Sequence, residues 1–155
     1  MLDSKTFKQI VSNTPLVSID LCLLFGKQIL LGKRNNEPLK GEWFTPGGRI
    51  YKNESWQNCL VRIAKSELGY AVTKLDDFIL MGVYDHFYPN SILDSEISTH
   101  YVNLPHYINL NRRLDLSEDS QHSKLKWYDL DFVAKSRNFN HYTRVYASYL
   151  LKENP

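Results

Sequence analysis

Apolar stretches alternate along the chain with polar segments that contain glycine and proline, and this spacing predicts a mixed α and β domain. The clearest stretch is residues 16–25, which is apolar at almost every position except Asp20. Such continuity is expected of a central strand that is covered on both faces. Further strands are predicted at residues 29–34, 78–88, 99–108 and 125–128.

Helical spacing and capping residues predict four helices. The first begins at Asp3 or Ser4 and runs to about residue 11. The second follows the pair Gly47-Gly48, which we interpret as a sharp turn, and it is capped by Asn53 or Ser55. The other two are predicted at residues 129–135 and 141–152.

The helix after Gly47-Gly48 carries a carboxylate on its apolar side. At about 100° per residue, its apolar stripe contains Trp56, Leu60, Ile63 and Ala64. Glu67 falls inside this stripe, where an ionised carboxylate is costly unless it is paired or binds a metal. Two interpretations stay open: Glu67 emerges at the rim of the core, or it points back to the turn as a ligand for a divalent cation.

Length and charge narrow the class of protein. The 155 residues predict one domain, residues 1–155, with a net charge of +2 that gives no argument for a nucleic-acid or membrane partner. Cys22 and Cys59 lie in apolar segments and are expected to be small buried side chains. No signal peptide is recognised and no apolar run approaches about 18–20 residues, so we expect a cytoplasmic protein.

Other polar residues have both a functional and a structural interpretation. Asp20 either lines a pocket or is paired at a sheet edge, and Arg34 either recognises phosphate or is solvated. His86 and Tyr101, in predicted strands, fit either a pocket wall or the core. His122 lies in a polar loop, where it is either solvated or a general base, since its ordinary pKa of about 6.5 suits that role near neutrality.

The helix and the turn before it resemble the Nudix hydrolase signature, G-x5-E-x7-R-E-U-x-E-E-x-G-U, in which U is aliphatic. The matching positions are Gly48, Glu54, Arg62, Glu67 and Gly69. Three positions depart from the signature: Ile63 and Ser66 replace glutamates, and Tyr70 replaces an aliphatic residue. The chain is therefore expected to hold fewer metal ions than the full signature does.

The rest of the chain resembles one branch of this family, the GDP-mannose mannosyl hydrolases, which break a carbon–oxygen bond at the sugar. The resemblance extends over residues 12–20, 30–34, 43–49, 86–88, 99–101 and 121–122. It implies an α/β (α+β) protein with the Nudix fold, an α/β/α sandwich around a mixed β-sheet.

The resemblance also implies an activity and its residues. The implied reaction is Mg²⁺-dependent hydrolysis of GDP-mannose, with GDP-glucose as the alternative sugar, to GDP and free sugar with inversion. The implied catalytic residues are His122 as general base, Asp20 to orient it or the sugar, and Arg34 and Arg49 on the diphosphate. The implied substrate contacts are Arg62, Tyr101 and His86. One Mg²⁺ per chain, replaceable by Mn²⁺, would take ligands from Gly47, Glu67 and Gln121.

Two other functions compete with this one. An ordinary Nudix pyrophosphatase would cut a phosphorus–oxygen bond, but the missing glutamates at Ile63 and Ser66 argue against it. A non-catalytic nucleotide-sugar sensor is opposed by the retained Glu67, Gln121 and His122. The resemblance further suggests a homodimer that acts in polysaccharide biosynthesis. Glu54 and Arg62 are interpreted as a salt bridge between loop and helix.

Overall fold

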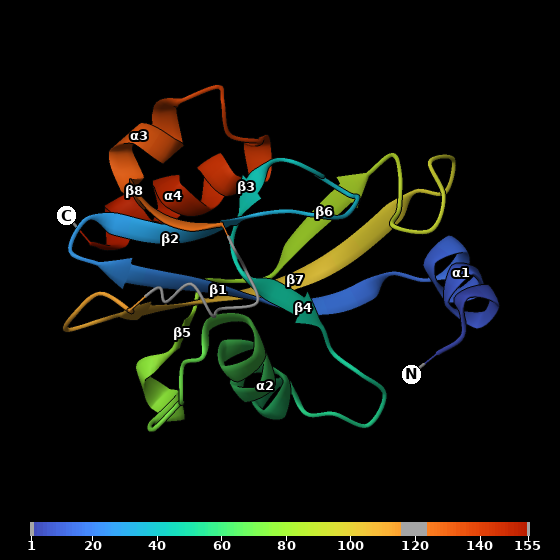
Figure 1. Cartoon of the computed structure of the whole chain (residues 1–155), viewed down its shortest axis with the longest axis horizontal. Coiled ribbons are helices and arrows are strands. Elements are labelled where there is room, and N and C mark those ends of the chain that lie inside the picture. The colour runs from blue at the N-terminus through green and yellow to red at the C-terminus, as the bar shows by residue number, and fades with distance from the viewer. Residues whose placement is uncertain (1, 116–123, 155) are drawn as a thin grey trace.

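The apolar run Leu16–Phe25 forms strand β1, which runs through the middle of a mixed β-sheet (Figure 1). The computed structural model describes residues 2–115 and 124–154. Along its length β1 pairs in parallel with β7 (Thr99–Asn109). Its other edge pairs in antiparallel fashion with β2 (Gln28–Lys33) and with β4 (Gly47–Arg49). The sheet is mixed, as predicted.

The outer strands complete the sheet on both sides of this centre. They are β3 (Trp43–Phe44), β5 (Ile79–Leu80), β6 (Tyr84–Tyr88) and β8 (Leu125–Asp129). β3 and β8 both pair with β2, whereas β5 and β6 both pair with β7. All four pairings are antiparallel.

β1 changes partner halfway along one edge. Leu24 and Phe25 pair with β2, but the segment from Ser18 to Asp20 pairs with β4. Between these two halves, the Leu21 amide donates to the carbonyl of Pro46, in the link from β3 to β4. The sheet therefore divides at this point, with β2 and β3 in one part and β4 in the other (Figure 1).

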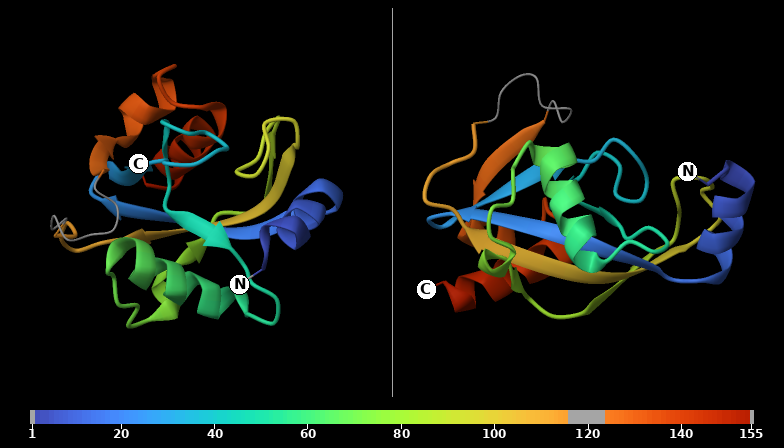
Figure 2. Two further views of the ribbon diagram at one scale, coloured as in Figure 1. Left: turned by 45° about the vertical axis from the view of Figure 1, so that its right-hand side comes forward. Right: turned by 90° about the horizontal axis from the view of Figure 1, so that it is seen from below.

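Helices cover both faces of the sheet (Figures 1 and 2). α2 (Trp56–Leu68) lies on one face, and α3 (Leu130–Lys135) and α4 (His141–Glu153) lie on the other. α1 (Ser4–Asn13) stands at the end of the sheet where β1 begins. A short 3₁₀ turn, Leu75–Asp77, precedes β5. The predicted α/β/α arrangement is confirmed.

The alternation of side chains along β1 divides the interior into two cores. Ile19, Leu21 and Leu23 face α2, whereas Cys22 and Leu24 belong to the core beneath α4. This is the two-residue period of a strand whose faces are both covered. Ser18 and Asp20 share the phase of Cys22, so the α4 face becomes polar toward the start of the strand.

Local capping chemistry sets the helix ends. The Asp3 carboxylate accepts from the Thr6 amide and the Ser55 hydroxyl accepts from the Asn58 amide, as expected of N-caps. Gly69 ends α2 with φ 62°, the left-handed conformation that glycine adopts without steric cost.

Three sequence predictions are wrong in detail. Gly47-Gly48 is part of a short strand that pairs with β1, not a sharp turn. The strand predicted at 78–88 is two strands, separated around Gly82 at φ 136°. Trp56 is 40% exposed and stacks on His106, because α2 turns Cys59 into the core in its place. Within the described part of the chain, no helix is long and apolar enough to cross a membrane.

Gly47 lies too close to β1 to carry a side chain. A Cβ at Gly47 would meet the Asp20 carboxylate and would lie 2.6 Å from the carbonyl oxygen of Ile19. We expect Gly47→Ala to lower the free energy of unfolding by about 1–3 kcal/mol, the usual cost of overpacking. Urea unfolding would measure this loss. Gly48→Ala is the matched control, since its Cβ would be 3.4 Å from Ile63, and an equal loss in both variants would contradict the argument.

Candidate functional site

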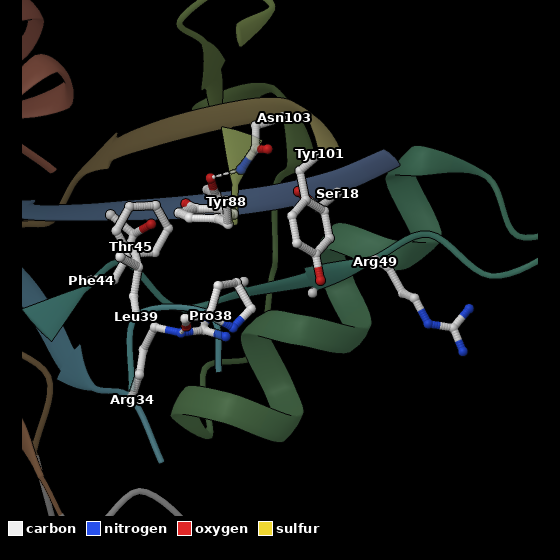
Figure 3. Close-up of a pocket in the computed structure, with 13 residues that line it drawn as sticks. Ser18, Arg34, Pro38, Leu39, Phe44, Thr45, Arg49, Tyr88, Tyr101 and Asn103 are labelled. Carbon is white, nitrogen blue, oxygen red and sulfur yellow. Dashed lines mark hydrogen bonds between the residues drawn. The ribbon is translucent and has the colours of Figure 1, made fainter. Parts of the chain in front are cut away.

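A pocket opens on the α4 face at the point where β1 passes from one partner strand to the other (Figure 3). β1 supplies Ser18 and Asp20, and β7 supplies Tyr101 and Asn103. The remaining wall comes from β4, from Tyr88, and from the segments around Pro38 and Thr45. Elements far apart in the sequence thus meet at one polar hollow.

Asp20 is the buried acid of this pocket, with 4% of its surface exposed. One of its oxygens, Oδ2, accepts hydrogen bonds from Asn103 Nδ2 at 2.5 Å and from the Tyr146 hydroxyl at 2.7 Å. Burial raises the pKa of Asp20 from 3.8 to about 6, although the two hydrogen bonds and Arg34 act in the opposite direction. Asp20 therefore lines the pocket, as one of its two interpretations predicted.

Arg34 and Tyr101 supply donors at the mouth of the pocket. The Nε of Arg34 donates to the Pro38 carbonyl at 2.6 Å, which fixes the direction of the guanidinium. Burial raises the pKa of Tyr101, so its hydroxyl keeps its proton and can donate to an anion. Arg49 also lines the pocket, but its guanidinium lies on the far side from Arg34 (Figure 3).

A stack of aromatic and cationic groups holds Arg49. Its guanidinium carbon lies 4.7 Å from the ring centre of Phe7 and 4.9 Å from that of Tyr51. Arg62 covers Tyr51 at 4.0 Å. Such stacking restricts the Arg49 side chain while leaving its N–H edges available for an anion.

A second hollow adjoins the first and shares Arg34, Thr45 and Gly47 with it. It also contains Lys33 and the half-buried Glu67. Since Asp20 and Gly47 face each other as a non-hydrogen-bonded pair, the Gly47 carbonyl is directed away from β1. Figure 3 shows α2, which carries Glu67, passing beneath the pocket.

These groups fit a hard divalent cation. Magnesium takes carboxylate and carbonyl oxygens and keeps several waters, so Glu67 and Gly47 are suitable donors. Ile63 is 1% exposed within the α2 core, and Ser66 is exposed, so neither supplies the carboxylates of the full signature. Among the described residues, no group of three or more His, Cys, Asp and Glu is placed to hold a metal.

Arg62 and His86, both expected at the site, line neither hollow. Gln121 and His122 lie outside the described residues. Arg62 bonds Glu54 through Nε at 2.8 Å and donates to the Arg49 carbonyl at 3.0 Å, so the expected loop-to-helix salt bridge is present. Arg62 does not line the pocket, but it contacts Arg49, which does.

His86 lies behind the pocket wall, in the core. It is 1% exposed and stacks on Tyr142 with ring centres 3.9 Å apart. Burial lowers its pKa to about 4, so the ring is neutral at physiological pH. Its Nδ1 lies 3.4 Å from the hydroxyl of Tyr88, which does line the pocket. Any contact between His86 and a substrate would therefore pass through Tyr88.

The structure also adds residues that the sequence analysis missed. Ser18, Thr45 and Asn103 line the pocket, and Tyr146 holds Asp20 from α4. Ser18 did carry a signal, since it stands two positions before Asp20 on the same face of an apolar strand. Asn103 stands in the same way two positions after Tyr101. Tyr146 looked like any other apolar position on a helix.

Comparison with known proteins gives a family match over most of the chain. Residues 15–149 match the family described as NUDIX domain. A relative in Haloferax volcanii, the low-salt glycan biosynthesis protein Agl8, is 41% identical over 123 residues, which cover 79% of this chain and 76% of that protein.

Solved structures share the fold. The MutT NUDIX hydrolase of Burkholderia pseudomallei superposes with a TM-score of 0.69 and 25% identity, over 89% of this chain and 99% of that one. The NUDIX domain of Shewanella oneidensis NrtR, solved with ADP ribose, has a TM-score of 0.62 and 18% identity, over 99% of this chain and 94% of that one.

The raised pKa of Asp20 predicts a pH-dependent cost in stability. The unfolded chain loses this proton near pH 3.8 and the folded chain near pH 6, so stability falls between these values and the loss persists above pH 6. Asp20→Asn keeps an oxygen for both donors and removes the charge. We expect its free energy of unfolding to exceed that of the wild type by about 1–3 kcal/mol at pH 8 and to match it near pH 3.5.

Urea unfolding at both pH values measures this difference. Asp131→Asn is the control, because its pair with Lys135 is exposed and is expected to contribute less than about 0.5 kcal/mol. An Asp20→Asn variant that is less stable than the wild type at pH 8 would show that the ionised carboxylate is a net stabilising group.

Proposed function

The chain belongs to the Nudix family, and from this premise we propose that it hydrolyses a GDP-sugar to GDP and the free sugar by attack of water on the sugar carbon. GDP-mannose is the proposed substrate, with GDP-glucose as the alternative sugar. The relative named for glycan biosynthesis supports a role in supplying or removing activated sugars. The proposal extends to a cytoplasmic homodimer acting in polysaccharide biosynthesis.

One observation carries this proposal: α2 presents a single carboxylate, Glu67, to the hollow that adjoins the Asp20 pocket. Nudix enzymes generally use divalent metals such as Mg²⁺. With Ile63 in the core and Ser66 exposed, few ligands remain to bind several ions and activate water against phosphorus. The polar pocket beside Glu67 can instead hold the sugar, whose anomeric carbon would then be the electrophile.

The cationic side chains of the two hollows suit the diphosphate of a nucleotide sugar. Arg34, Lys33 and Arg49 are cationic groups that can bind the diphosphate and stabilise it as it leaves. The Tyr101 hydroxyl can donate to the same leaving group. When bound by Glu67 and Gly47, with Gln121 as the third proposed ligand, Mg²⁺ would neutralise charge on the diphosphate.

The water needs a base on the face of the sugar opposite the diphosphate. His122 is the proposed base, and its role rests on the sequence because it lies outside the described residues. Asp20 would position the sugar or His122, since its carboxylate is fixed by Asn103 and Tyr146. Attack from the opposite face inverts the anomeric carbon.

The metal proposal predicts one essential Mg²⁺ per chain. Glu67→Gln should weaken Mg²⁺-dependent binding of GDP by about 10- to 100-fold, because a neutral amide is a poor replacement for a carboxylate ligand. Calorimetric titration of GDP with and without Mg²⁺ measures the loss, and Mn²⁺ should substitute for Mg²⁺. Ser66→Ala, one residue earlier and exposed, should bind as the wild type does. Two tightly held ions would contradict the proposal.

The site of attack predicts where labelled oxygen appears. Hydrolysis of GDP-mannose in water enriched in ¹⁸O should place the label in mannose and leave GDP unlabelled. Proton NMR recorded before mutarotation should show β-mannose first, since inversion is proposed. Label in GMP or mannose 1-phosphate would establish a pyrophosphatase instead.

Two other results would each reject one part of the proposal. Label in mannose with α-mannose first would keep the broken bond and reject His122 as an opposite-face base. Absence of turnover, with Mg²⁺-dependent binding retained, would establish a nucleotide-sugar sensor.

A further inference from the structure

Unsatisfied polar atoms gather in the Asp20 pocket. Within residues 2–115 and 124–154, five buried side-chain nitrogen or oxygen atoms have no hydrogen-bond partner. Three of them line this one pocket: Ser18 Oγ, Thr45 Oγ1 and Asn103 Oδ1. The three residues are 4%, 5% and 3% exposed. A buried polar group without a partner lowers the free energy of unfolding. Three such atoms in one pocket therefore indicate a ligand that forms hydrogen bonds with them.

The three groups belong to one surface. Ser18 and Asn103 stand opposite each other in the parallel pairing of β1 with β7, so their side chains leave the same face of the sheet. Thr45 lies in the link between β3 and β4, where the sheet divides. All three appear around the pocket in Figure 3.

Asp20 fixes which atom of the Asn103 amide faces the pocket. The carboxylate can only accept a hydrogen bond when ionised, so the NH₂ group of Asn103 must point at it, as the 2.5 Å contact shows. The carbonyl Oδ1 is therefore turned to the other side (Figure 3). It is an acceptor, and only a ligand that donates can satisfy it.

This acceptor excludes an anion at the same place. A phosphate oxygen would face Asn103 Oδ1 and would also lie near the Asp20 carboxylate, both of which are negative or partly negative. The hydroxyls of Ser18 and Thr45 can accept or donate, so they adapt to a neutral group with several O–H bonds. The cationic residue Arg34 stands across the pocket, where the phosphates are expected.

We propose that Ser18, Thr45 and Asn103 form a hydroxyl-binding subsite that holds the sugar of the nucleotide sugar, with Asn103 Oδ1 accepting from one sugar hydroxyl. This inference rests on the proposed function and adds the orientation of the substrate in the pocket. The sugar lies against β1 and β7, and the diphosphate lies toward Arg34 and Glu67.

Binding by near-isosteric variants tests the subsite. Ser18→Ala and Thr45→Val each remove one hydroxyl, and we expect each to weaken GDP-mannose binding about 5- to 10-fold in Mg²⁺ while the Kd of GDP stays unchanged. Because the protein is proposed to hydrolyse GDP-mannose in Mg²⁺, initial rates give both constants, as the KM of GDP-mannose and the inhibition constant of GDP. If the two constants shift by the same factor, the residues do not contact the sugar and the subsite is wrong.

Deoxy analogues identify the contact directly. GDP-mannose analogues that lack one sugar hydroxyl should bind the wild type more weakly. For the hydroxyl that Ser18 or Thr45 contacts, the protein variant and the analogue should show no further loss when combined. Fully multiplicative losses with every analogue would overturn the proposal.

Stability separates this role from a structural one. Since the Thr45 hydroxyl has no partner among the described residues, Thr45→Val should leave the melting temperature of the free protein unchanged or raise it. The matched control is Thr99→Val, because the buried Thr99 hydroxyl donates to the Asn90 carbonyl at 2.7 Å. We expect this control to melt a few degrees (~4–8 °C) lower and to keep its preference for GDP-mannose over GDP.

The outcomes distinguish this inference from the function on which it rests. If the wild type neither binds nor hydrolyses GDP-mannose, the proposed function fails and the subsite fails with it. If the wild type hydrolyses GDP-mannose but the Ser18 and Thr45 variants lose no selectivity for the sugar, only the subsite fails.

Discussion

The buried carboxylate of Asp20 links the three parts of the chain that form the candidate site. Its Oδ2 accepts from Asn103 on β7 and from Tyr146 on α4, while Asp20 itself belongs to β1. An ionised group in an apolar strand needs such partners, because its desolvation is otherwise very costly. The same carboxylate faces Gly47, which must lack a side chain for β4 to pair closely with β1. The Asp20 carboxylate thus constrains β7 and α4 through hydrogen bonds and β4 through close packing.

This arrangement lowers the stability of the free protein, and a bound ligand would offset part of that loss. Burial raises the pKa of Asp20, so folding with the ionised acid is unfavourable near neutrality. Ser18, Thr45 and Asn103 add polar atoms without partners among the described residues. A core filled only for stability would place apolar groups here, as it does further along β1 at Cys22. The local loss of stability is therefore itself an argument for binding.

The sequence predicted elements wherever one local rule acted alone. β1 has the predicted bounds because its apolar run is continuous, and α2 ends at Gly69 because only glycine fits that cap cheaply. β4 was missed because a Gly-Gly pair is typical of a turn, and these two glycines form a strand only by pairing with β1. The polar wall around Asn103 could not be predicted, since the register between β1 and β7 is a property of the assembled sheet.

The loss of two signature glutamates has a structural consequence for the chemistry. Ile63 packs in the α2 core beside Gly48, where a carboxylate would be buried among apolar groups. Packing at this position thus favours an apolar side chain, so the proposed metal site would combine Glu67 with carbonyl, amide and water oxygens. Fewer carboxylates leave less charge to hold ions around phosphorus, and the neighbouring hollow contains the hydroxyls and the amide oxygen of the proposed sugar subsite. The proposal that water attacks carbon rests on these two features together.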